Sequence, residues 1–275
     1  MTLNCKGKLI DITDPKVMGI LNVTPDSFYD GAAYPNDTAI LSAVENMLLE
    51  GATFIDIGGY SSRPGADEVS LKDELKRVIP TIQLVLKEFP ECLISVDTFQ
   101  SKVAAESIAA GAALINDISA GQLDPNMMQT VGELGVPYIM MHMKGTPKTM
   151  KDLTQYDDLI KDINFYFSQR LAEARSYQIK DLIIDPGFGF AKTRSQNFEL
   201  LKKLEHLKIS DVPILIGLSR KSMIYKTLLT TSDEALNGTT ALNTIALIKG
   251  ANILRVHDVK EALECIKLTQ QLNEA

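Results

Sequence analysis

One short pattern recurs along this chain and limits the folds that it can adopt. A stretch of helical character ends in Gly, a short apolar run follows after one or two residues, and a polar residue closes the run. The pattern occurs at 51–56, 111–116, 135–142 and 250–257. Glycine suits this place because the residue after the last helical turn commonly adopts a left-handed conformation. We therefore expect repeated units in which a helix is followed by a strand.

The apolar runs are too short for helices, and they do not alternate between apolar and polar residues. Such runs are typical of strands buried on both faces, as in a parallel sheet. Other runs of this kind, which bring the total to about eight strands, lie at 17–21, 92–96, 182–184 and 213–216. Helices are predicted at 38–50, 70–89, 100–110, 156–177, 236–249 and 260–272. Ser70 and Asp73 resemble a variant capping box that opens one of them.

Alternating strands and helices predict a parallel sheet with right-handed crossovers. Eight such units favour a closed (β/α)8 TIM barrel of the α/β class over an open doubly wound sheet. A barrel of this kind typically needs about 250 residues, which is nearly all of the 275 present. No linker rich in Pro, Gly or Ser and no shift in composition divides the chain. We therefore predict a single domain over residues 1–275.

Charge and composition exclude several classes of protein. The net charge of −7 argues against general nucleic-acid binding, which relies on an excess of Lys and Arg. No apolar stretch approaches about 18 residues, so no membrane span is expected. Residues 1–12 lack the basic start and apolar stretch of a signal peptide. The three cysteines are far apart and lack CxxC spacing, which predicts reduced thiols in a cytoplasmic protein rather than a structural zinc site.

Catalytic groups of a (β/α)8 barrel lie at the carboxyl ends of its strands. The polar residues at or near the ends of the apolar runs are Asn22, Asp56, Asp97, Asn116, His142, Asp185, Ser219, Arg255 and His257. Any one of these could be structural and satisfy loop amides at the rim of the barrel. The architecture, however, aims the whole set at one concave face, so together they predict a binding site.

The chemistry of that set suggests a class of ligand. Asp97, Asn116 and Asp185 offer hydrogen-bond acceptors. Donors from strand ends and loops would be Arg63, Arg220, Lys221, Arg255 and His257. The expected ligand is therefore rich in N–H donors and also carries an anion.

Segments near the strand ends allow both structural and functional interpretations. The segments 22–31 and 58–65 are rich in Gly, Pro, Ser and Asp; they are either ordinary loops or lids that close over a substrate. Arg63 could make a charge-assisted contact to phosphate there. In 217–222, Ser222 could cap a helix whose N–H groups suit an anion, or the segment is simply a basic capped turn. Phe190 could belong to the core or stack on a flat ligand.

Several motifs together resemble the dihydropteroate synthase family. The matching segments, in family order from about residue 17 to 258, are 18–28 (MGILNVTPDSF), 61–65 (SSRPG), 95–98 (SVDT), 115–117 (IND), 140–143 (MMHM), 185–189 (DPGFG), 219–222 (SRKS) and 255–257 (RVH). Each motif is weak alone, whereas the complete ordered set is specific.

The resemblance implies a (β/α)8 barrel with a defined reaction. It would join 6-hydroxymethyl-7,8-dihydropterin diphosphate to p-aminobenzoate and release diphosphate, with Mg²⁺ as cofactor, in folate biosynthesis. A homodimer is expected, formed through helices on the far half of the barrel. Sulfonamides mimic p-aminobenzoate, which makes them plausible inhibitors.

The resemblance also implies roles for individual residues. Pterin would be bound by Asp97, Asn116, Met140, Asp185, Phe190, Gly217, Lys221 and Arg255. Diphosphate would be bound by Asn22, which also holds Mg²⁺, and by Ser62, Arg63, Arg255 and His257. p-Aminobenzoate would be bound by Phe28, Arg63, Pro64, Phe190, Ser219, Lys221 and Ser222. The residues expected to be catalytic are Asp30, Arg63, Asp97, Asp185, Lys221 and Arg255.

One position departs from the family pattern. Many members have Glu where this chain has Tyr60, just before the 61–65 motif. We expect that change to affect loop contacts and to leave the core of the site intact. Two alternatives remain: a pterin-binding methyltransferase domain, which shares the acceptor set, and a non-catalytic barrel that binds pterin or a protein.

Overall fold

The computed structural model of the chain describes residues 1–24, 36–60, 69–207 and 212–274. Within these residues, eight parallel strands form the central sheet. They are β3 (Lys16–Asn22), β4 (Phe54–Gly58), β5 (Ile94–Asp97), β6 (Leu114–Asp117), β7 (Tyr138–Met141), β8 (Leu182–Asp185), β9 (Leu215–Ile216) and β10 (Ile253–Val256). Each run predicted to be a strand contains or overlaps one of them.

The sheet closes on itself. Its hydrogen-bonded order runs from β8 through β7, β6, β5, β4, β3 and β10 to β9, and every pairing is parallel. A parallel bridge between Ile184 and Ile214 joins the two ends of this order, and the Ile184 N–H donates to the Pro213 carbonyl at 3.0 Å. The predicted (β/α)8 barrel is therefore confirmed, and the open doubly wound sheet is excluded.

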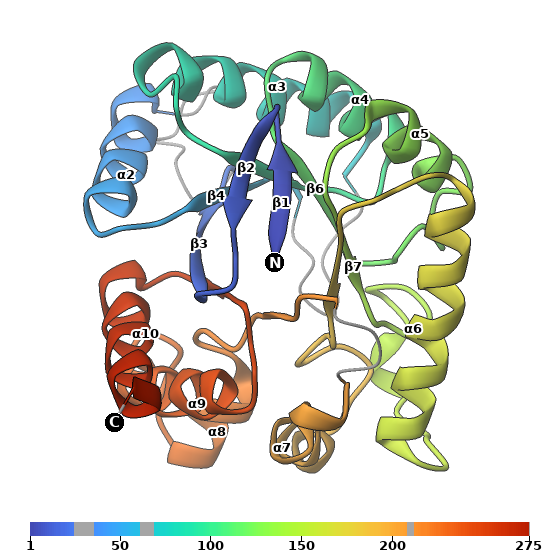
Figure 1. Cartoon of the computed structure of the whole chain (residues 1–275), viewed down its shortest axis with the longest axis vertical. Coiled ribbons are helices and arrows are strands. Elements are labelled where there is room, and N and C mark those ends of the chain that lie inside the picture. The colour runs from blue at the N-terminus through green and yellow to red at the C-terminus, as the bar shows by residue number, and fades with distance from the viewer. Residues whose placement is uncertain (25–35, 61–68, 208–211, 275) are drawn as a thin grey trace.

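Helices surround the barrel (Figure 1). They are α2 (Asp37–Leu49), α3 (Leu71–Glu88), α4 (Ser101–Ala109), α5 (Met127–Leu134), α6 (Leu159–Ser176), α7 (Arg194–Lys202), α8 (Ser222–Leu228), α9 (Leu236–Ile248) and α10 (Val259–Glu274), with 3₁₀ turns η1 (Met150–Asp152) and η2 (Leu204–Leu207). The six predicted helices are confirmed. α5 ends at Gly135, as the recurring pattern predicted, but no range was given for it, and α7 was not predicted. No helix among the described residues is long and apolar enough to cross a membrane.

Helix ends follow the predicted chemistry. Gly51, Gly111, Gly135 and Gly250 all have positive φ, between 65° and 109°, as expected for residues that end a helix. Ser70 is the N-cap of α3, and its hydroxyl accepts the Asp73 N–H at 3.2 Å. The Asp73 carboxylate accepts the Ser70 hydroxyl at 2.6 Å.

Strand residues alternate between two apolar environments. In β4, Ile55 and Ile57 belong to the large core between strands and helices, whereas Phe54 belongs to a smaller cluster inside the barrel. By the same alternation Asp56 lies on the inner face, where it is fully buried. Polar side chains on inner positions are therefore held within the ring of strands.

An N-terminal hairpin, which was not predicted, fills one end of the barrel. β1 (Thr2–Cys5) and β2 (Lys8–Asp11) pair through a two-residue turn whose residues, Lys6 and Gly7, both have positive φ, as a type I′ turn requires. Leu3, Cys5 and Ile12 are buried against the early inner residues of the strands, which include Met18, Phe54, Leu114, Ile139, Ile183, Leu215 and Ile253. The amino-terminal end is thus closed, which leaves the carboxyl end for a ligand.

The hairpin offers a matched pair of leucines for testing this packing. Leu3 is 1% exposed and Leu9 is 69% exposed. We expect Leu3→Ala to lower the free energy of unfolding by about 3 kcal/mol, because it removes buried methyl groups and leaves a cavity. Leu9→Ala should change it by less than about 0.5 kcal/mol. Urea unfolding followed by circular dichroism measures both, and equal effects would contradict the plugged barrel.

Candidate active site

The carboxyl ends of the strands bring together most of the predicted site residues that the structure describes. Strand pairing places Asn22 beside Gly58, Gly58 beside Asp97, and Asp97 beside Asn116. Phe28, Asp30, Ser62, Arg63 and Pro64 lie outside the described residues. The described part of the site is therefore the floor formed by the strands and the turns that follow β8 and β9.

A buried ion-pair cluster lies at the centre of this floor. Arg255 donates from Nε to Asp56 Oδ2 at 2.5 Å and from Nη2 to Asp97 Oδ2 at 2.9 Å. The guanidinium joins β10 to β4 and β5, and its side chain is only 19% exposed. Asn116 Nδ2 also donates to Asp56 Oδ2 at 3.0 Å. That bond orients the amide and leaves the Asn116 carbonyl oxygen as an acceptor.

Tyr60 completes the cluster, contrary to the expectation that this position affects only loop contacts. The side chain is 6% exposed, and its hydroxyl donates to Asp97 Oδ1 at 2.9 Å. Asp97 is thus held through one oxygen by Arg255 and through the other by Tyr60. The departure from the family pattern therefore lies inside the site.

Burial and charge act against each other in this cluster. Burial raises the pKa of Asp97 to about 7, although the Arg255 guanidinium opposes that rise. Burial tends to lower the pKa of Arg255, but the nearby Asp56 and Asp97 carboxylates outweigh it and raise that pKa above its ordinary value. Arg255 is therefore a permanent cation, whereas Asp97 can change protonation near neutral pH.

A second acceptor and a lysine lie across the barrel. Asp185 ends β8 and accepts the Gly187 N–H on Oδ1 at 2.8 Å. Lys221 donates to the Phe188 carbonyl at 2.5 Å, and its Nζ lies 4.9 Å from the centre of the Phe190 ring. Burial lowers the pKa of Lys221 to about 8, although the Asp185 charge opposes this change. Burial also raises the pKa of Asp185. Phe190 is partly buried, so one part of its ring remains accessible.

Hydrogen bonds with two buried side chains, Lys192 and Asn197, hold the turn after β8. Lys192 Nζ donates to the Gly187 carbonyl at 2.9 Å and to the Phe190 carbonyl at 3.0 Å, and it lies 3.0 Å from His142 Nδ1. Gly189 N–H donates to Asn197 Oδ1 at 2.6 Å. His142 is therefore a buried partner of Lys192. Lys192 could not be predicted from the sequence, because nothing near it marks a buried lysine.

The structure corrects the placement of Met140. In β7, Ile139 lies in the cluster inside the barrel, whereas Met140 belongs to the outer core with Tyr138. Met141 is the next inner residue and packs in the same cluster as Tyr60. The residue of this strand that could face a ligand is therefore Met141, one position later than predicted.

Two interpretations of the 219–222 motif need correction, and a third residue of it has a partner within the site. Ser219 Oγ lies 2.9 Å from His257 Nδ1 and accepts the His257 backbone N–H at 3.2 Å, so these two predicted ligand contacts lie next to each other. Arg220 turns toward Asp258, with bonds of 3.1 and 2.5 Å, instead of joining the central donors. Ser222 is the first residue of α8 and does not cap it, because Lys221 occupies the N-cap position.

Asn22 has the donor chemistry that Mg²⁺ prefers. Its Oδ1 lies 3.6 Å from the position that a Cβ of Gly58 would take, next to Asp97. Mg²⁺ is commonly held by one or two protein oxygens together with substrate phosphates. No group of three or more His, Cys, Asp or Glu placed to hold a metal occurs among the described residues. Asn22 thus fits a metal ion that arrives with a phosphate ligand.

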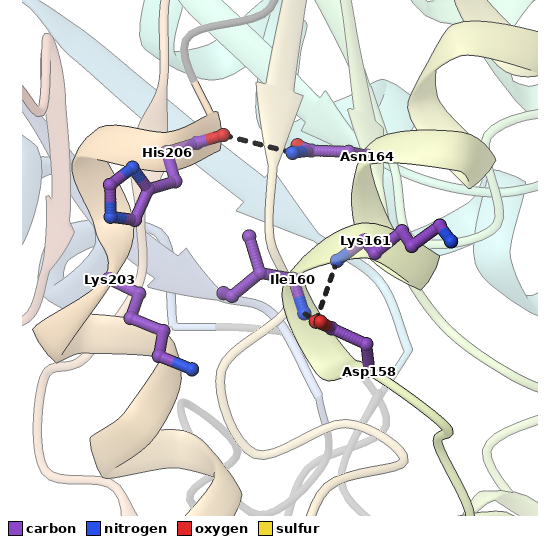
Figure 2. Close-up of a pocket in the computed structure, with 6 residues that line it drawn as sticks. All are labelled: Asp158, Ile160, Lys161, Asn164, Lys203 and His206. Atoms are coloured by element: carbon purple, nitrogen blue, oxygen red, sulfur yellow. Dashed lines mark hydrogen bonds between the residues drawn. The ribbon is translucent and has the colours of Figure 1, made fainter.

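Figure 2 shows an open hollow elsewhere, on the outer wall between α6 and η2. Its polar groups are already paired: Asp158 Oδ1 accepts the N–H groups of Ile160 and Lys161, both at 3.1 Å. Asn164 Nδ2 donates to the His206 carbonyl at 2.9 Å. His206 is exposed. None of these residues comes from a strand end, so the hollow is separate from the site.

Comparison with known proteins decides the family. A family model described as pterin binding enzyme matches residues 18–257. The chain is 43% identical to dihydropteroate synthase from Escherichia coli K12, over 98% of this chain and 96% of that protein. It is 44% identical to the Haemophilus influenzae enzyme of the same name, over 98% of each. The chain belongs to the dihydropteroate synthase family.

Solved structures agree with this assignment. A dihydropteroate synthase from Yersinia pestis, in complex with a sulfonamide drug, superposes with a TM-score of 0.94 at 42% identity, and the match covers 100% of each chain. The Xanthomonas albilineans dihydropteroate synthase with 4-aminobenzoic acid superposes with a TM-score of 0.92 at 38% identity, over 100% of this chain and 98% of that one. The protein is a transferase of folate biosynthesis.

The two titrating groups of the site predict a bell-shaped pH profile for kcat/KM. Asp97 must be ionised to accept hydrogen bonds, so activity should fall as the pH drops below about 7. Lys221 must be protonated to carry its charge, so activity should fall as the pH rises above about 8. Steady-state assays across pH measure both limbs. Lys221→Arg should extend the alkaline limb, and a flat profile from about pH 6 to 9 would contradict these assignments.

Proposed function

We propose that the strand-end cluster binds the dihydropterin and promotes loss of its diphosphate, after which p-aminobenzoate attacks the pterin methylene carbon. The observation that carries this proposal is the Asp56–Arg255–Asp97 cluster, flanked by the Asn116 and Asp185 acceptors. The reaction joins 6-hydroxymethyl-7,8-dihydropterin diphosphate to p-aminobenzoate and yields 7,8-dihydropteroate and diphosphate. No side chain acts as a covalent nucleophile in this scheme.

The acceptors match the edge of a pterin, which carries an amino group and ring N–H groups. Asp97 and Asp185 accept from these groups, and the Asn116 carbonyl oxygen accepts alongside them. Lys221 lies beyond the ring, near Asp185. Because Asp97 and Asp185 are buried, their charge is weakly screened and can stabilise the positive charge that develops on the pterin.

The positively charged groups of the site act on the departing diphosphate. Arg255 is fixed between two carboxylates, yet its side chain is 19% exposed and can cover the ring and contact the diphosphate. His257 directly follows β10, the strand that carries Arg255. Donors placed where charge develops stabilise the transition state more than the ground state. Bound Mg²⁺, held through Asn22, would add neutralisation of the departing diphosphate.

The second substrate binds beside the turn that follows β9. Phe190 offers an accessible apolar surface, and Lys221 offers a charge that attracts the p-aminobenzoate carboxylate. The same contacts would admit sulfonamides, which mimic that substrate. The Yersinia pestis and Xanthomonas albilineans structures hold such ligands, and their similarity to this chain supports the proposal.

Diphosphate release tests the reaction. Purified protein receives the dihydropterin diphosphate and Mg²⁺, with and without p-aminobenzoate, and dihydropteroate is measured in parallel. We expect release that depends on p-aminobenzoate, and loss of turnover when EDTA removes Mg²⁺. Pterin binding without turnover would favour a methyltransferase domain or an inactive barrel.

Two substitutions test the charge-stabilisation account. Asp185→Asn and Arg255→Ala should each lower kcat/KM by roughly tenfold to a hundredfold, because each removes a charge-assisted hydrogen bond to the reacting molecule. Asp233→Asn, whose side chain is 89% exposed, is the control and should leave kcat/KM unchanged. Effects within about threefold at both positions would contradict the account.

A homodimer is proposed through the face formed by α8, α9 and α10. These helices pack side by side in the structure (Figure 1). They expose large apolar side chains, among them Leu228 (54% exposed), Leu268 (72%) and Ile248 (60%). Exposed apolar groups gathered on one face are typical of association surfaces. A second copy of the chain would cover them.

Sedimentation velocity tests this association. We expect the wild-type protein to sediment as a dimer and the double variant Ile248→Glu/Leu268→Glu as a folded monomer, because buried charge opposes association. Phe165→Glu is the matched control, since Phe165 is 63% exposed on α6, whose main helix neighbours are α5 and α7. A charged double variant that remains dimeric would place the interface elsewhere.

We also infer a cytoplasmic location. The three cysteines, Cys5, Cys92 and Cys265, are unpaired and buried, as is common in reducing compartments.

A further inference from the structure

Tyr60 occupies a place that the reaction scheme above does not use. It is the second residue after β4, and its hydroxyl reaches Asp97, the acceptor carboxylate on the neighbouring strand. Asp97 has only two oxygens, and the other one is bound by Arg255. With a donor on each oxygen, the plane of the carboxylate is fixed from two directions.

We propose that Tyr60 is a positioning residue that holds the Asp97 carboxylate in the orientation in which it accepts the pterin N–H groups. This inference rests on the proposed role of Asp97 in pterin binding. Each carboxylate oxygen can accept two hydrogen bonds, so a ligand can bind while Tyr60 and Arg255 remain bound. Tyr60 itself touches no reacting atom in this scheme.

The phenol ring is held firmly enough for that role. It packs edge-on against Phe99, with ring centres 5.2 Å apart, and shares an apolar cluster with Met141 and Ile118. The backbone before it is fixed as well, because Arg77 Nη1 of α3 donates to the Gly59 carbonyl at 2.8 Å. A side chain at position 59 would meet Val78 Cγ2 at 2.6 Å, so glycine allows α3 to approach. Contacts to the ring and to the preceding backbone therefore fix the direction of the hydroxyl.

The charges around Tyr60 keep it a neutral donor. Glu74 of α3, Asp97 of β5 and Asp117 of β6 are the acidic groups near its ring. Burial together with these carboxylates raises the pKa of Tyr60 well above its usual value. Around Asp97, Arg255 and Tyr60 favour the ionised carboxylate, whereas burial, Asp56 and Glu74 disfavour it. Removing the Tyr60 hydroxyl should therefore move Asp97 toward its protonated form.

Tyr60→Phe tests the proposal because it removes one oxygen and keeps the ring. We expect kcat/KM for the dihydropterin substrate to fall about tenfold, as for loss of a hydrogen bond to a charged group. The acid limb of the pH profile should move to higher pH, and KM for p-aminobenzoate should stay within about twofold. In an Asp97→Ala background, Tyr60→Phe should have little further effect on pterin affinity, because the coupling between the two residues is gone.

Tyr138→Phe is the matched control. Tyr138 is also a buried tyrosine that donates to a buried carboxylate, Asp117 Oδ2, at 2.6 Å, but it lies on the outer face of β7. It should leave the pterin kinetics and the acid limb unchanged. If Tyr60→Phe fails to fold, replacing Tyr60 with 3-fluorotyrosine keeps the shape and strengthens the donor, so the acid limb should move to lower pH.

The outcomes separate this inference from the proposed function. Unchanged pterin kinetics and an unchanged pH profile in Tyr60→Phe, with active wild-type protein, would overturn the positioning role alone. Unchanged pterin affinity in Asp97→Ala would overturn the role of Asp97 and the inference with it. Equal losses in Tyr60→Phe and Tyr138→Phe would show that Tyr60 acts only through stability.

Discussion

The guanidinium of Arg255 is the interaction on which the site depends. It lies between Asp56 and Asp97, and it lets two carboxylates remain close together inside the barrel. A buried ion pair adds little net stability, because desolvation offsets most of the attraction, but loss of one partner leaves an uncompensated charge. What the ion pairs provide is a fixed geometry. They hold β4, β5 and β10 in one arrangement, and the Asp56 oxygen that binds Arg255 also orients the Asn116 amide.

The closed barrel explains why the polar site residues lie at one end of it. Parallel strands aim their carboxyl ends in one direction, and the N-terminal hairpin fills the opposite end with Leu3, Cys5 and Ile12. Between these ends the interior is packed, so a ligand meets only the last inner layer of side chains. The turn after β8 is also held in place. Lys192 and Asn197 bind its backbone, which carries Phe190 and whose Phe188 carbonyl accepts the hydrogen bond from Lys221.

Much of this architecture could be predicted from the sequence, because unbroken apolar runs indicate buried strands and glycines indicate the ends of helices. The same runs do not show which strand residues point into the barrel. In β7 both faces are apolar, so nothing distinguished Met140 from Met141. Side-chain partners far apart in sequence were equally hidden: Arg220 pairs with Asp258, Ser219 with His257, and Tyr60 with Asp97. Such choices are made by tertiary contacts rather than by local pattern. The roles proposed for residues within 25–35 and 61–68 stay predictions.

The position of the N-terminal hairpin has a consequence for the order of folding. Its docking surface combines residues from β3 at one end of the barrel sequence to β10 at the other, so that surface exists only after the last strand has joined. This hairpin therefore gains its full set of native contacts only when the barrel closes. Interactions formed after the folding transition state govern the rate of unfolding more than the rate of folding. The contacts between the hairpin and the barrel are therefore expected to slow unfolding more than they speed folding.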